Sequence, residues 1–107
     1  MTVFTISSSA QDNTSVTGEL VDMNCYMAHG AKGDDHKSCA TACIKGGAPM
    51  AVLTSDGKLY LLVADHGKKD AYEEAKKYAG SQVTVTGSLS EKDGIKGIVI
   101  TEVKVKS

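Results

Sequence analysis

Residues 50–64 read MAVLTSDGKLYLLVA, and this stretch decides the kind of fold that the chain forms. Two runs rich in apolar and β-branched residues, 50–55 and 58–64, flank the dipeptide Asp56-Gly57. Because both positions of an Asp-Gly pair tolerate a positive φ, this dipeptide favours the two-residue turn of a β-hairpin. The stretch therefore predicts a hairpin at the centre of a β-rich domain.

Three further strands are predicted around this hairpin. Apolar and polar residues alternate over 15–23 and 81–89, and a last apolar run covers 95–105 after the turn Asp93-Gly94. Within this last run the apolar phase shifts by one position. Such a shift predicts a β-bulge near Thr101-Glu102 and a strongly coiled strand.

Two helices are predicted between the strands. A short helix follows Asp34 and Asp35, either of which can cap its first turn, and it ends at Gly46-Gly47. A second helix covers 70–79, where alanines recur at helical spacing, and Gly80 closes it. The elements then follow the order strand, helix, strand, strand, helix, strand, strand.

This order predicts an all-β domain in the broad sense, a β-rich α+β fold. It resembles the oligonucleotide- and oligosaccharide-binding (OB) fold, a five-stranded Greek-key barrel, over residues 15–106. Gly18, Gly87 and Gly97 lie inside strand patterns, where the resemblance implies that a tight barrel must bend. The alternative is a small open sheet with a helix packed on one face.

Length and charge limit the classes of function. The chain has 107 residues, enough for one domain, with a net charge of −1. All twelve cationic residues are lysine, and only five residues are aromatic, so nucleic acid is not an expected partner. No apolar run is long enough to predict a membrane span.

The amino-terminal residues 1–14 are predicted to be the remnant of a signal peptide and a flexible tail. Small residues at Ser8 and Ala10 suit cleavage after Ala10, ahead of a polar stretch. We therefore expect a periplasmic or secreted protein with one domain over 15–107. Export matters for the cysteines, because an oxidising compartment pairs thiols that no metal or reductant protects.

All three cysteines lie between residues 25 and 43. His36, Cys39 and Cys43 are spaced three and then four apart, so a helix would place them on one face. With Cys25 arriving from the end of the first strand, they complete a tetrahedral Cys3His set, for which zinc is the usual structural ion. We therefore predict that an insertion at 25–48 binds one metal ion.

Copper(I) is the alternative ion, because methionines and a second histidine flank the cysteines. Met27, Met50 and His29 are candidate additional ligands, since thioether sulfur suits a soft monovalent ion. His66, in the loop after the third strand, is a weaker candidate of the same kind. Each methionine is more simply explained as a residue that fills gaps in a core or loop.

The segments GELVDMNC (18–25) and HKSCATACIKGG (36–47) together resemble a pattern in small exported bacterial proteins. The resemblance implies export and implies that Cys25, His36, Cys39 and Cys43 act together. It implies no activity.

Two alternatives use sulfur chemistry without a metal. Cys25 could form a disulfide with Cys39 or Cys43, leaving one odd thiol, or Cys39 and Cys43 could act as a redox couple. A Cys–His nucleophile is also conceivable, but no third orienting residue is identifiable. We therefore expect a metal-binding protein rather than an enzyme, with a protein partner that exchanges metal or electrons as a further expectation.

Overall fold

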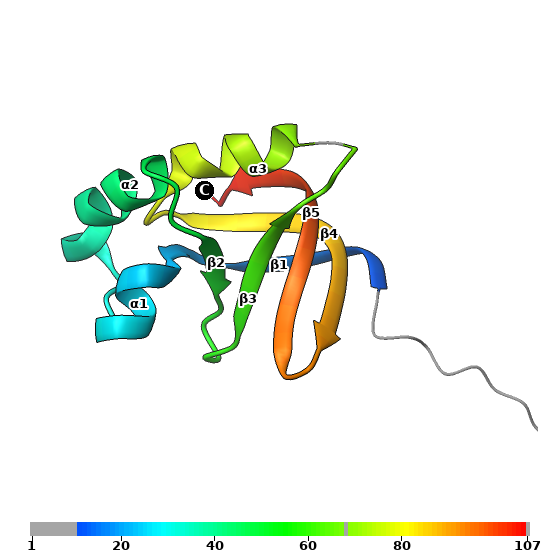
Figure 1. The fold of residues 1–107 in the computed structure, drawn as a ribbon, viewed down its shortest axis with the longest axis horizontal. Coiled ribbons are helices and arrows are strands. Elements are labelled where there is room, and N and C mark those ends of the chain that lie inside the picture. Colours follow the sequence, from blue (N-terminus) through cyan, green and yellow to red (C-terminus); the bar gives the residue numbers. More distant parts are fainter. Residues whose placement is uncertain (1–10, 68, 107) are drawn as a thin grey trace, which may run out of the picture.

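The computed structural model describes residues 11–67 and 69–106. Its five strands pair in the order β1-β2-β3-β5-β4, and β4 pairs back with β1, so the sheet closes in a ring (Figure 1). The β3–β5 pair is parallel, and the other pairs are antiparallel. The strands are β1 (Gln11–Asp22), β2 (Met50–Leu53), β3 (Leu59–Ala64), β4 (Gln82–Lys92) and β5 (Ile95–Val105). The prediction of a β-rich, five-stranded domain is confirmed.

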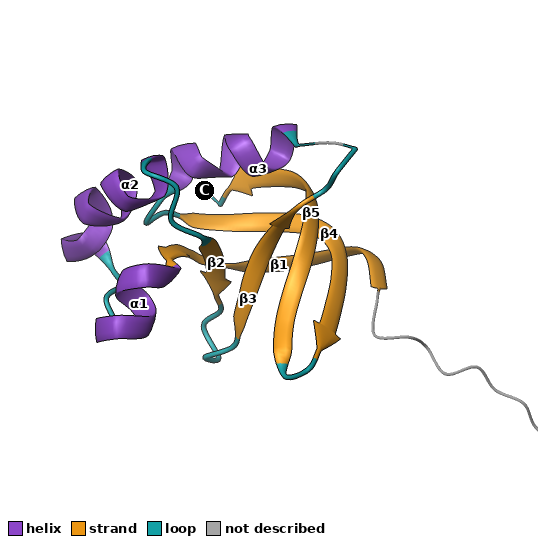
Figure 2. Ribbon diagram, in the orientation of Figure 1, coloured by secondary structure: helices purple, strands orange, loops and turns teal. Residues whose placement is uncertain are grey.

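The helices occupy two connections of the ring (Figure 2). Between β1 and β2 the chain forms α1 (Met23–His29), a 3-10 turn (Asp34–His36) and α2 (Lys37–Lys45). Between β3 and β4 it forms α3 (Asp70–Ala75), which a second 3-10 turn (Lys76–Tyr78) extends. The first connection therefore holds one helix more than the sequence predicted.

The core fills the interior of the ring with apolar side chains from every strand. Helix α2 adds Ala40 and Ile44 to it, and α3 adds Ala71 and Ala75. The fully buried core residues with the largest side chains are Leu20, Ile44, Met50, Ile98, Ile100, Val52, Val83 and Val85. These contacts fix α2 and α3 on the ring, since burial of apolar area is the main stabilising force.

The hairpin turn differs from the prediction. Its loop has three residues rather than two, because Thr54 N–H donates to the Lys58 carbonyl at 2.9 Å and closes it. Gly57 has a φ of 85°, whereas Asp56 keeps a negative φ and accepts a short hydrogen bond from the Thr54 hydroxyl. The Asp56 side chain thus stabilises the longer turn. The two-residue form is found instead at Asp93-Gly94, where both φ values are positive, 54° and 86°.

Close approach of strands explains two of the three glycines. A Cβ at Gly18 would lie 2.2 Å from the Leu53 carbonyl oxygen, and one at Gly87 only 2.0 Å from that of Val99. Gly97 has ordinary room for a side chain, with its nearest contact at 3.5 Å, so close strand approach does not explain this glycine.

The bulge predicted near Thr101-Glu102 is confirmed. Thr86 pairs with Glu102, while its neighbour Gly87 pairs with Ile100, so Thr101 has no partner in the register of β4 and β5.

Strand β1 starts at Gln11, earlier than the predicted start at Ser15. The predicted signal remnant up to Ala10 lies outside the described residues. Among the helices of the described chain, none has the length and apolar character that crossing a bilayer requires.

Candidate metal centre

Helix α1 begins at the end of β1 because Asp22 caps it. The Asp22 backbone is extended, with φ −85° and ψ 130°, and its Oδ1 accepts a hydrogen bond from Cys25 N–H at 2.8 Å. Gly30, with a φ of 68°, ends the helix in the left-handed conformation. The cap places Cys25 in the first turn of α1, facing the segment that follows.

Helix α2 carries the other two cysteines. Ala40 and Ile44 are buried in the core, and Cys39 and Cys43 precede them by one position each. Because residues four apart lie on the same face of a helix, the two thiols form a row beside the buried row. Packing of the apolar row therefore fixes where the thiols lie.

The three thiols come together between α1 and α2, which are neighbours in Figure 1. The sulfur atoms of Cys25, Cys39 and Cys43 all lie within 4.8 Å of one another. All three are free cysteines, and Cys39 is exposed whereas Cys25 and Cys43 are half-buried. Three thiolates at this separation are a donor set for a soft or borderline metal ion.

A second donor set adjoins the first and shares Cys25 with it. Ligand atoms of Asp22, Cys25 and His36 also lie within 4.8 Å of one another. His36 Nε2 lies 3.0 Å from Asp22 Oδ2, and the Asp22 side chain is fully buried while that of His36 is 16% exposed. One buried carboxylate therefore holds both the Cys25 backbone and the His36 ring.

The surroundings of Cys25 favour its neutral thiol when no metal is bound. Its pKa is raised from 9.0 to about 11 by burial first, and then by the negative charge of Asp22, a hydrogen bond with Cys43 and the nearby Cys43 and Cys39 thiols. A metal ion reverses this balance, because it binds thiolate and releases the proton.

The predicted ligands thus lie in two overlapping sets rather than in one row on a helix. His36 ends the 3-10 turn before α2, and its ring contacts Asp22. Neither Asp34 nor Asp35 caps this segment, because the residue at the cap position of the turn is Gly33 and that of α2 is His36. The expectation of an aspartate cap is wrong, and the four-residue ligand set stays a prediction.

The secondary candidates lie at other places. Met50 is fully buried in the core, and Met27 is 68% exposed on α1. His29 is exposed in the last turn of α1, and His66 is exposed in the turn after β3. Neither of these two histidines belongs to a metal-ligand group of the described chain.

Asp22 is the site residue that the sequence reasoning missed. It is the one charged residue found fully buried in the described part of the chain. Two signals pointed to it: its position three residues before Cys25, as in an N-cap, and Gly30 at the matching end of a short helix. Both were overlooked because 28–33 resembled a flexible connection.

Searches against protein-family models, curated proteins and solved structures find no match to this chain.

Proposed function

We propose that this protein binds one metal ion, zinc or copper(I), through Cys25, Cys39, Cys43 and His36. The observation that carries the proposal is the convergence of three thiols from two separate helices within 4.8 Å. None of the three cysteines is among the core residues of the described chain, and Cys39 is exposed. The exposed side of Cys39 gives the ion a route of entry.

Asp22 has a defined part in this proposal. A histidine that ligates a metal commonly donates its other ring N–H to a carboxylate, which fixes the tautomer and the ring orientation. Here Asp22 Oδ2 lies 3.0 Å from His36 Nε2, so we assign the proton to Nε2 and the metal-binding lone pair to Nδ1. Asp22 would then orient two ligands, since it also caps the turn that holds Cys25.

Zinc and copper(I) make different demands on this set. Zinc in a structural site takes four ligands, so it needs His36 together with the three thiolates. Copper(I) is softer and is satisfied by sulfur, so the three thiolates can suffice for it. Loss of His36 should therefore weaken zinc binding more than copper(I) binding, which separates a structural role from a metal-handling role.

We also propose an OB-like barrel as the fold that carries the metal site, and export as the location of the protein. A ring of five strands with a helix between β3 and β4 supports an OB-like Greek-key barrel as the scaffold. Export fits such a site, because in an oxidising compartment a bound metal would protect the three thiols from forming disulfides. Expression of the full-length gene, followed by separation of periplasm from cytoplasm, tests the location.

A thiol–disulfide or copper-delivery activity is the second candidate, and the contact between Cys25 and Cys43 favours it. Their sulfur atoms lie within 4.8 Å of each other although they belong to different helices. A disulfide partner could oxidise them: a bond forms between the two sulfurs, the partner's disulfide is reduced, and two thiols leave on the partner. Attack by exposed Cys39 on that bond would form a new disulfide with one of the two cysteines and release the other as a thiol, whereas a dithiol partner, itself oxidised to a disulfide, would reverse the reaction.

Metal analysis combined with thiol titration distinguishes the candidates. The purified protein should hold one ion per chain, and its three thiols should react slowly until a chelator removes the ion. Ser38→Ala, next to Cys39 on α2, is the control and should keep both properties, whereas Cys25→Ser should lose one sulfur ligand and hold the ion far more weakly. A metal-free protein with two cysteines joined in a disulfide would contradict the proposal and favour the second candidate.

A further inference from the structure

An apolar groove lies on the side of α1 away from the thiols. It encloses about 540 Å³ between α1 and the ends of the β2–β3 and β4–β5 hairpins. Met23 and Met27 are four residues apart and share one helix face, whereas Cys25 lies between them on the opposite face. The groove is therefore separate from the proposed metal centre, although both use the same short helix.

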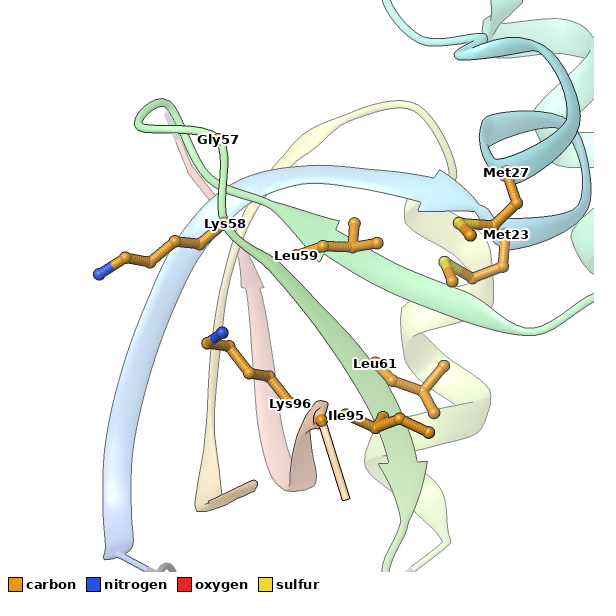
Figure 3. A pocket seen from close by; sticks show the side chains of 9 residues that line it. Met23, Met27, Gly57, Lys58, Leu59, Leu61, Ile95 and Lys96 are labelled. Carbon is orange, nitrogen blue, oxygen red and sulfur yellow. The ribbon is translucent and has the colours of Figure 1, made fainter. Parts of the chain in front are cut away.

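The groove has an apolar side and a cationic end. Two of its apolar side chains are largely exposed, Met27 at 68% and Ile95 at 61%. Figure 3 shows Lys58 and Lys96 at one end, with their ammonium groups on the side away from the methionines. The apolar side chains that line it are Met23, Met27, Leu59, Leu61 and Ile95.

The lining and the size of the groove indicate the kind of ligand that suits it. No aromatic side chain is among the nine residues that line the groove, so it offers no platform on which nucleic-acid bases could stack. By itself, a groove lined by nine residues is smaller than a standard protein interface, to which each side contributes roughly 20–30 residues. Its volume instead falls within the range of about 300–1,000 Å³ that is usual for small-molecule sites.

We propose that the groove binds a free, single-chain anionic amphiphile, such as a medium-chain carboxylate. The alkyl chain would cover Met23, Met27 and Ile95, and the anionic head would lie near Lys58 and Lys96. Flexible methionine side chains adapt readily to an alkyl chain. Burial of exposed apolar surface would drive binding, and the lysines would set the direction of the ligand and the sign of its charge.

Each of these two lysines has a carboxylate nearby, and Asp56 forms an ion pair with Lys58. Asp56 Oδ2 lies 3.8 Å from Lys58 Nζ, and Glu91 is the partner of Lys96 in the β4–β5 register. Glu91 makes no ion pair with Lys96 in the described chain, and both are exposed. In the free groove, Lys96 is thus the cation that the head of a ligand can reach.

Methionine methyl NMR during a titration with sodium dodecanoate, below its micelle concentration, tests this proposal. The Met23 and Met27 methyl signals should shift and saturate, whereas Met50, fully buried in the core, should not respond. Dodecyltrimethylammonium, with the same chain and the opposite charge, should bind several-fold more weakly. Equal response to both amphiphiles, shifts of all three methyl signals, or no saturable shift would overturn the proposal. Stronger binding to phosphatidylglycerol vesicles than to free dodecanoate would also overturn it.

Substitutions test which end of the groove binds the alkyl chain and which end binds the anionic head. Met27→Glu should weaken dodecanoate binding by at least about tenfold, since it removes apolar contact and adds a like charge. The double change Lys58→Gln and Lys96→Gln should weaken it by about fivefold, and Glu91→Gln should strengthen it by about twofold. Lys104→Gln, a lysine exposed elsewhere on β5, is the matched control. Equal effects of Lys104→Gln and of the double change would contradict the assignment. The Met27 and lysine variants leave the cysteines intact, so metal content reports separately on the proposed function.

Discussion

The ring of strands and helix α1, in the connection between β1 and β2, are stabilised in different ways. The ring is held by an apolar interior, and α1 in the connection has no buried residue at all. Helix α1 instead depends on the Asp22 cap and on the side chains around Cys25. The strands thus have a core of their own, whereas α1 is placed by contacts around Asp22 and Cys25. Stability and metal binding should therefore respond to different substitutions.

The largest effect should come from breaking the ring itself. Gly87→Ala would place a Cβ 2.0 Å from the Val99 carbonyl oxygen, which forces β4 and β5 apart. We expect the free energy of unfolding of the metal-free protein to fall by about 3 kcal/mol or more in urea denaturation. Gly97→Ala, with its nearest contact at 3.5 Å, is the matched control and should cost far less. Equal losses would show that close strand approach does not explain these glycines.

Removal of one ligand should loosen only the connection. Cys43→Ser should increase hydrogen exchange over residues 23–49 of the protein kept in metal, while the hairpin 50–64 stays protected. The stabilisation lost by the connection would be about 2.7 kcal/mol where free metal exceeds the Kd about 100-fold. Uniform loss of protection over both regions would mean that the thiols belong to the main core.

Asp22 links the ring to α1, and a substitution can remove its charge while keeping the helix cap. Asp22→Asn keeps an oxygen that can accept from Cys25 N–H but no longer holds His36 as a carboxylate does. We expect metal affinity, measured by competition with a chromophoric chelator, to fall about 10–100-fold. Asp22→Ala should also lower the free energy of unfolding by ~1 kcal/mol, because it removes the helix cap.

Asp34→Asn, an exposed position in the 3-10 turn, should leave the affinity unchanged. If Asp22→Asn left the metal affinity unchanged, Asp22 would have no role in the metal site.

The smallest effect concerns pH. The Cys25 thiol has a pKa of about 11 in the folded protein and 9.0 as the ordinary value, so the unfolded chain gives up this proton first. Its contribution to stability is complete below pH 9 and is lost as pH rises through about 11.

Denaturation of the metal-free protein across this pH window should show the decline, and Cys25→Ser should lack it. Alkylation of Cys25 with iodoacetamide should likewise lag until the pH approaches 11. Rapid alkylation of Cys25 near pH 8 would contradict this assignment.

Sequence patterns predicted the ring better than the connection, and the reason is physical. Alternation in β4 and the phase shift at Thr101 follow directly from which side chains face the core. The turn at Asp56 was predicted too short, because its side chain bonds Thr54 instead of leaving its backbone free for a positive φ. Local turn chemistry of this kind involves side-chain contacts that periodicity does not report.

The site was predictable only in its residue types. The spacing of Cys39 and Cys43 on one helix indicated a shared face, and α2 has this arrangement. The burial of Asp22 and its contact with His36 depend on how β1 delivers α1 to the ring, which is a matter of tertiary structure. The helix 23–29 was also missed, since it has no buried apolar face that would produce a periodic pattern.

X-ray absorption at the metal edge of the loaded protein tests the central claim most directly. With zinc, the account predicts one ion per chain with three sulfur ligands at about 2.3 Å and one nitrogen at about 2.0–2.1 Å. His36→Ala should remove the nitrogen and leave the sulfurs. A shell of nitrogen and oxygen alone, or a sulfur count that Cys25→Ser does not change, would contradict the claim that these thiols form the metal centre.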